Sequence, residues 1–255
     1  MYRFLLKPKW LAFHFLCLAA MVAMVLLSLW QFRRLDERTS FNDRVSANTH
    51  APLAPLADLL ALPAADVEYR RAEVTGTYEP GHQFLVVNVT QDGLTGRDVV
   101  DALRLTDGSL IIVNRGFVAN TTPIPAMPSG TVTITGRLKH GQRAGTGEPS
   151  DDGTKTLTEI RRVDLGALSQ QFDDPVQPMY LELLSSDPKE SDDLKVIKFP
   201  TLDNGPHLSY AIQWLIFTIC IAVGWVIAVR RSVREKAGVP PKKRRGPPPI
   251  ADEHR

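Results

Sequence analysis

Twenty consecutive uncharged residues, LAFHFLCLAAMVAMVLLSLW from Leu11 to Trp30, decide how this chain is organised. A second uncharged stretch, LSYAIQWLIFTICIAVGWVIAV, covers 22 residues from Leu208 to Val229. A helix rises about 1.5 Å per residue, so either stretch can cross a hydrocarbon core that is roughly 30 Å thick. The sequence therefore predicts two transmembrane helices, 11–30 and 208–229, with residues 31–207 between them.

The first stretch also has the basic start of a secretory signal peptide, since Arg3, Lys7 and Lys9 precede it. Its apolar run is longer than the roughly 7–15 residues of a signal core, and Ser28-Leu29-Trp30-Gln31 is no small-x-small cleavage site. We therefore expect an uncleaved anchor. Buried core helices are the alternative for both stretches, but flanking Lys and Arg residues favour membrane spans.

The distribution of charge predicts which side of the membrane each segment occupies. Residues 1–10 carry three Lys or Arg and no acid, and residues 230–255 carry nine against three acids. Residues 31–207 carry 18 Lys or Arg against 25 acids. Because basic residues beside a span are retained in the cytoplasm, we expect both termini there and 31–207 outside. No Arg- and Ser-rich transit peptide precedes the first span, which favours a bacterial plasma membrane over an organelle.

The segment 31–207 is predicted to continue the first helix to about Ala47 and then to form a β-rich domain with one or two helices. Asp107-Gly108 is typical of a tight hairpin turn. A helix is expected at Val163–Phe172, where Asp164 offers an N-cap. The expected strands are Arg71–Tyr78, Phe84–Val87, Val99–Leu105, Leu110–Val118, Thr131–Leu138, Thr154–Ile160 and Val176–Leu184.

Three further segments are read from composition. A short helical turn is expected at Pro55–Leu60, and the acidic stretch Ser185–Asp193 is expected to be exposed. The basic, proline-rich tail 230–255 favours contact with anionic lipid over nucleic acid, because it follows a membrane span. The predicted fold class is thus an α+β membrane protein, in which two transmembrane helices flank a β-rich extracytoplasmic domain.

One pattern at the start of the second span suggests chemistry. His207, Tyr210, Ala211 and Trp214 recur at three- and four-residue spacing, so a helix places them on one stripe. A flat metal macrocycle fits such a stripe, and neutral imidazole ligates haem iron. The alternative is that Tyr210 and Trp214 are ordinary interfacial anchors and that His207 is a solvated residue at a helix start.

Other classes of site are disfavoured. Cys17 and Cys220 both lie within the spans, so 31–207 holds no disulfide and no thiolate nucleophile. Copper(I) prefers sulfur ligands, and 31–207 offers only two methionines, far apart. His14 and His207 lie near opposite membrane faces and cannot share one iron. No catalytic motif is present, so we expect no enzymatic activity.

Three motifs, in order along the chain, resemble those of the Surfeit-locus-one family of cytochrome c oxidase assembly factors. They are Trp30-Gln31-Phe32-Arg33 at the end of the first span, Gly76-Thr77-Tyr78 followed by Asp107-Gly108 and Val113-Asn114-Arg115-Gly116-Phe117-Val118, and His207-Leu208-Ser209-Tyr210-Ala211-Ile212-Gln213-Trp214. Phe117 replaces the usual Trp, and the Asn204-Gly205-Pro206 lead looks like an actinobacterial variant. The resemblance covers about Leu27 to Trp214.

The resemblance implies a chaperone of the respiratory chain that holds haem a at the outer membrane interface and helps to insert it into the catalytic subunit of a haem–copper oxidase. Its implied partners are that subunit, other oxidase or respiratory supercomplex subunits and membrane lipid. His207 would be the axial ligand. The other implied haem contacts are Tyr210, Ala211, Trp214, Trp30, Gln31, Arg33 and Arg115, the two arginines as partners of the propionates. The alternatives are a haem-free scaffold for a half-assembled subunit and a two-span sensor.

Overall fold

A computed structural model of the protein describes residues 2–238, which fold as two units. The first, here called the helix pair, consists of residues up to Ser40 together with those from Asp203 onward. The second, here called the barrel unit, consists of Phe41–Leu202. The predicted basic tail lies partly outside the described residues, since it includes 239–255.

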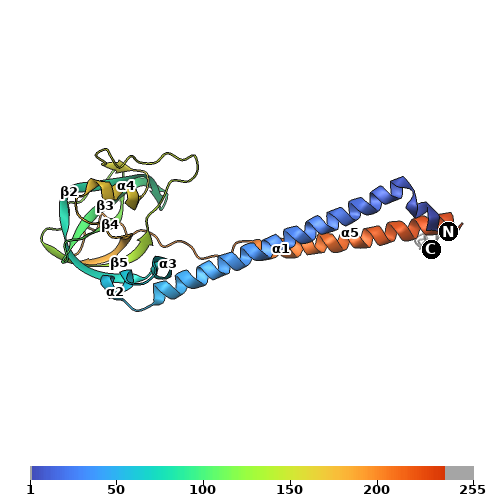
Figure 1. Cartoon of the computed structure of the whole chain (residues 1–255), viewed down its shortest axis with the longest axis horizontal. Helices are drawn as coiled ribbons and strands as arrows, with labels where there is room; N and C mark the ends of the chain where they lie inside the picture. Colours follow the sequence, from blue (N-terminus) through green and yellow to red (C-terminus); the bar gives the residue numbers. More distant parts are fainter. Residues whose placement is uncertain (1, 239–255) are drawn as a thin grey trace, which may run out of the picture. The chain divides into compact units, whose positions relative to one another are not determined.

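The helix pair is built from the two apolar stretches (Figure 1). A 3-10 turn, η1 (Tyr2–Leu6), precedes the long helix α1 (Pro8–His50), and α5 covers His207–Lys236. The continuation of the first helix past its span is confirmed. The two helices run antiparallel, because residues later in α1 contact residues earlier in α5: His14 contacts Trp225, Ser28 contacts Ala211, and Gln31 contacts His207.

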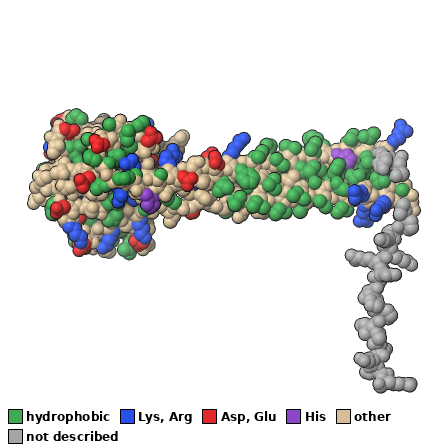
Figure 2. All heavy atoms as spheres, turned by 90° about the horizontal axis from the view of Figure 1, so that it is seen from below, with side chains coloured by type: hydrophobic (Ala, Val, Ile, Leu, Met, Phe, Trp, Pro, Cys, Tyr) green, Lys and Arg blue, Asp and Glu red, His purple; other side chains and the backbone are tan. Residues whose placement is uncertain are grey.

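Both helices are long and apolar enough to cross a membrane. Apolar side chains cover most of the pair, and Lys and Arg side chains gather at one end of it (Figure 2). Only 6% of the apolar window of α1 is buried, and none of that of α5. The helices of a soluble core would bury these surfaces, whereas lipid accepts them at no cost. The pair therefore fits two membrane spans.

The barrel unit is a closed sheet (Figure 1). Its strands are β1 (Ala54–Pro55), β2 (Arg71–Gln91), β3 (Leu94–Leu105), β4 (Leu110–Ala119), β5 (Thr131–His140), β6 (Glu159–Ile160) and β7 (Met179–Asp187). Neighbours run in the order β2, β3, β4, β7, β5, and β5 pairs back to β2. The hairpin predicted at Asp107-Gly108 is confirmed between β3 and β4, where Gly108 has φ +86°.

Strand β4 is buried along nearly its whole length, since its residues Leu110–Val118 are all buried. Alternate side chains of a strand point to opposite faces. Ile111 and Val113 accordingly join one apolar cluster, and Ile112 joins another on the opposite face. Strand β4 therefore has apolar side chains packed against both of its faces.

The helices of the barrel unit are shorter and more numerous than expected. They are α2 (Leu56–Leu60), α3 (Ala64–Val67), α4 (Leu165–Leu168) and the 3-10 turn η2 (Ser169–Gln171). The predicted N-cap is confirmed, since the Asp164 carboxylate accepts from the Gly166 amide at 2.9 Å. The strand expected at Thr154–Ile160 forms only at β6, because the preceding residues form a loop bound by side chains of η2.

The prediction that Ser185–Asp193 is exposed is confirmed for most of the stretch, although its first residues belong to strand β7. The exception is the Glu190 side chain, which is only 10% exposed because it pairs with Arg115. Composition alone cannot reveal this pair, since its partners are 75 residues apart.

Candidate functional site

His207 is the first residue of α5, and its imidazole is fixed by the other helix of the pair. Its Nδ1 lies 2.8 Å from Oε1 of Gln31, a residue that is only 9% exposed. An amide oxygen can only accept a hydrogen bond, so Nδ1 carries the proton and donates it. In the neutral ring, Nε2 then keeps a free lone pair. Histidines that bind metal almost always donate their other ring N–H in this way.

The rest of the predicted stripe divides between two environments. Ala211 is fully buried, and the Ser28 hydroxyl donates to its carbonyl oxygen at 3.0 Å. Tyr210 and Trp30 are exposed, at 47% and 52%. Trp214 is half-buried, with its ring 5.9 Å from that of Phe217. Ala211 thus lets the helices approach closely, and the exposed aromatic rings lie outside that contact.

Of the two predicted arginines, only Arg33 belongs to the helix pair, and its side chain is exposed. Arg115 belongs to the barrel unit, where its guanidinium is fully buried. It donates to Asp101 at 3.0 Å, to both carboxylate oxygens of Glu190 at 2.9 and 2.7 Å, and to the Ala126 carbonyl at 3.0 Å. Pairing of either arginine with haem propionates stays a prediction, and these contacts give Arg115 a role within its own unit.

Arg115 reaches these partners from a β-bulge in β4. Where β3 pairs with β4, the register shifts so that Arg115 is the extra residue. The side-chain oxygen Oδ1 of the preceding residue, Asn114, supports the bulge by accepting from the Gly116 N–H at 3.1 Å. Gly116 has φ +142°, and an added Cβ would lie 2.7 Å from the Lys195 carbonyl. The motif Asn114-Arg115-Gly116 therefore shapes the barrel wall and fixes residues 190–195 against it.

Burial sets the protonation of the acids around this bulge. The Asp101 carboxyl is buried, which raises its pKa, while its contacts with Arg115 oppose the rise. Burial would lower the pKa of Arg115, but its hydrogen bonds to Glu190 and Asp101 raise it overall. Burial also raises the pKa of Asp98 to about 6; a hydrogen bond from Asn114 opposes this rise, and the charge of Glu182 adds to it.

The raised pKa of Asp98 predicts that the barrel unit is more stable at pH 5 than at pH 7. The folded carboxyl binds its proton more tightly than the unfolded one, whose pKa is near 3.8, so protonation favours the fold. We expect Asp98 to add about 1 kcal/mol to the free energy of unfolding between pH 7 and pH 5. The pKa of Asp101 is raised as well, so both carboxyls contribute to the pH dependence of the wild type. The contribution of Asp98 is the difference between the pH dependence of the wild type and that of Asp98→Asn, each measured by urea unfolding. An identical pH dependence in both proteins would contradict the assignment.

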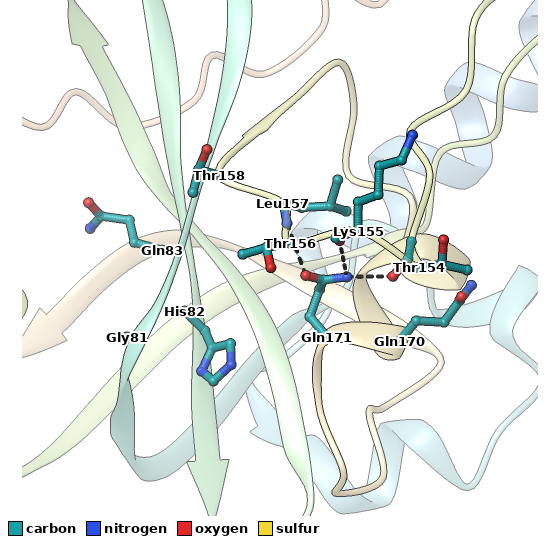
Figure 3. Close-up of a pocket in the computed structure, with 11 residues that line it drawn as sticks. Gly81, His82, Gln83, Thr154, Lys155, Thr156, Leu157, Thr158, Gln170 and Gln171 are labelled. Carbon is teal, nitrogen blue, oxygen red and sulfur yellow. Dashed lines mark hydrogen bonds between the residues drawn. The ribbon is translucent and has the colours of Figure 1, made fainter.

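A polar cavity of about 390 Å³ lies between β2 and the loop before β6, where sequence reasoning predicted nothing (Figure 3). Gln171 forms one wall: its amide nitrogen donates to the carbonyls of Gly153 and Lys155, and its oxygen accepts from the Leu157 N–H. The other wall includes His82, whose ring lies 4.7 Å from that of Phe172. The Nδ1 of His82 is buried and has no hydrogen-bond partner among the described residues. Within residues 2–238, no three His, Cys, Asp or Glu side chains come together to hold a metal.

Comparison with known proteins gives a family match that covers most of the chain. The model of the SURF1 family matches residues 18–240. The chain belongs to the SURF1 family. Uncharacterized SURF1-like proteins of Mycobacterium bovis and Mycobacterium tuberculosis are each 31% identical to it over 253 aligned residues. These alignments cover 93% of this chain and 91% of each relative.

SURF1 proteins are known as cytochrome oxidase assembly factors, so membership supports an assembly role and suggests a protein without catalytic activity. The matched region holds both the pairing of Gln31 with His207 and the bulge at Arg115. Sequence reasoning placed Gln31 near the site but missed its contact with Nδ1. It also missed the polar contacts between helices. Ser28 and His14 could have indicated these contacts, because a polar side chain in an apolar span needs a hydrogen-bond partner.

Proposed function

We propose that this SURF1 protein holds haem a at the outer face of a bacterial plasma membrane and helps to insert it into the catalytic subunit of a cytochrome c oxidase. Both termini lie in the cytoplasm in this proposal, and the barrel unit lies outside. The haem is cargo that the protein receives and passes on, so the binding site must be both specific and reversible.

The hydrogen bond between His207 and Gln31 carries the proposal. It fixes the imidazole in the tautomer whose Nε2 lone pair is free for an axial bond to iron. The start of α5 also leaves room near this atom, because Gly205 has no side chain. A Cβ added there would lie 3.5 Å from Nε2. The ligand atom is therefore oriented by a second residue and unobstructed by the turn that precedes the helix.

Other residues of the helix pair would complete the site. The exposed rings of Tyr210 and Trp30 offer apolar faces to a macrocycle, and Trp214 adds a third ring that is half-buried. Arg33 is an exposed cation on α1, of the kind that pairs with a propionate. These contacts would contribute affinity, while His207 would give the site its selectivity for an iron macrocycle.

The proposal is tested by purifying the full chain in detergent from cells that make haem a and recording its absorption spectrum. A haem a spectrum near one haem per chain would support the carrier. Protein that is free of haem but still co-purifies with oxidase would refute the carrier and leave a haem-free scaffold for a half-assembled subunit. Haem b in place of haem a would refute the assigned cargo.

A further inference from the structure

The opposite end of the helix pair, where the N-terminus lies, carries a cluster of aromatic rings. Trp10 contacts Phe4 and Phe13 with ring centroids 5.6 Å apart in each case, and it lies 5.7 Å from the ring of His14. His14 in turn meets Trp225 of α5 edge-on at 5.8 Å. The rings thus join the first turns of α1 to the last part of the apolar stretch of α5.

His14 is fixed in the opposite tautomer to that of His207. The indole Nε1–H of Trp225 donates to His14 Nδ1 at 2.8 Å. Indole nitrogen can only donate, so Nδ1 is the acceptor and, in the neutral ring, the proton is on Nε2. This Nε2 has no lone pair for iron. Within residues 2–238, no group accepts from Nε2–H, and an N–H donor in a membrane span needs an acceptor.

A cavity of about 310 Å³ is lined by Lys9, Trp10, Phe13 and Ala228. The rings of Trp10 and Phe13 lie 5.7 and 6.0 Å from that of His14. The surroundings of the cavity are strongly basic. The described residues at this end include seven cations, namely Arg3, Lys7, Lys9, Arg230, Arg231, Arg234 and Lys236, and one acid, Glu235, which is paired with Arg231. The cavity therefore offers apolar walls, an ammonium group and excess positive charge.

We propose that this cavity binds one anionic phospholipid. Its phosphate would bind Lys9, an ester carbonyl would accept from His14 Nε2–H, and an acyl chain would lie against Phe13 and Ala228. Lys9 and His14 are about 7.5 Å apart along the helix axis, at about 1.5 Å per residue. This spacing suits a lipid, whose ester carbonyls lie deeper in the bilayer than its phosphate.

The order of groups along the cavity favours a lipid over a helix of another protein. Along α1, the cation Lys9 comes first, the rings of Trp10 and Phe13 that line the cavity follow, and the donor His14 lies five residues after Lys9. The lipid site requires only that the pair crosses a membrane, so it is independent of whether His207 binds haem.

The test uses the full chain in nanodiscs that contain equal amounts of phosphatidylglycerol and phosphatidylcholine, with the retained lipids counted by native mass spectrometry. One phosphatidylglycerol per wild-type chain is expected, preferred about fivefold over phosphatidylcholine, as about 1 kcal/mol per basic contact implies. Lys9→Ala should remove most of this preference. Lys7→Ala is the matched control: it removes an equal charge that does not line the cavity.

Trp225→Phe keeps an aromatic ring but removes the donor that fixes His14, so it should weaken retention with little change in helix content. Three results would overturn the proposal. An equal fall of the preference in Lys9→Ala and Lys7→Ala would indicate a diffuse basic belt. Equal retention of phosphatidylcholine and phosphatidylglycerol would show that the site does not select an anionic lipid. A second protein in the cavity, with no lipid retained by the chain, would show that the occupant is not a lipid.

Discussion

His207→Ala is expected to abolish haem a binding, and Gln31→Leu to weaken it by about 10- to 100-fold, the usual effect of losing a residue that orients a metal ligand. Leucine cannot accept the Nδ1–H of His207, so the ring would lose both its fixed orientation and its fixed tautomer. Haem titration of the purified full chain measures the affinity. The reduction potential reports on the axial imidazole, which becomes less electron-rich without its acceptor.

Two variants separate this effect from general damage to the helix pair. Gln31→Glu keeps an oxygen that accepts from Nδ1, so it should keep haem and lower its reduction potential. Gln213→Leu makes the same exchange at an exposed position of α5 and should change nothing. Equal losses in Gln31→Leu and Gln213→Leu would contradict the positioning role. If the wild type binds no haem, ¹⁵N spectra of labelled histidine still report whether Nδ1 of His207 carries the proton.

Sequence predicts the features of this site that lie within one helix. Spacing places His207, Tyr210, Ala211 and Trp214 on one stripe, but it cannot say which of them faces α1. That depends on how each helix is rotated about its own axis where the two pack side by side. Polar contacts within the apolar surface, such as that from Ser28 to Ala211, set this rotation. The result is that Ala211 packs between the helices while Tyr210 is exposed.

The strands of the barrel unit were predicted from alternation, but their partners were not. Arg71–Tyr78 and Phe84–Val87 read as separate strands, whereas both belong to β2. This strand pairs with β5 along its first part and with β3 farther on, with a register shift between Tyr78 and Gln83. Through this change of partner, β2 forms backbone hydrogen bonds with two neighbouring strands. The pairing depends on residues far away in the sequence, which local patterns do not contain.

The buried ion pairs of Arg115 are also long-range contacts, and they lead to the second large prediction: Arg115→Ala should lower the free energy of unfolding of the barrel unit by about 3–5 kcal/mol. The guanidinium and the Asp101 carboxylate are fully buried, and Glu190 is 10% exposed. Removing the cation leaves two acids desolvated and without their partner. It also removes the two hydrogen bonds that hold Glu190 against β4. Urea unfolding followed by circular dichroism measures the loss.

Arg104 is the matched control, because it also binds two acids, Glu79 and Asp174, at 2.8 and 2.9 Å, but it is 36% exposed. Arg104→Ala should cost much less than Arg115→Ala, because water screens an ion pair at the surface. The triple variant Arg115→Met, Asp101→Leu, Glu190→Met removes all three charges and should recover much of the stability lost in Arg115→Ala, since a buried ion pair adds little beyond apolar groups of similar volume. An Arg115→Ala protein as stable as Arg104→Ala would show that water reaches Asp101 and that the bulge holds without its cation.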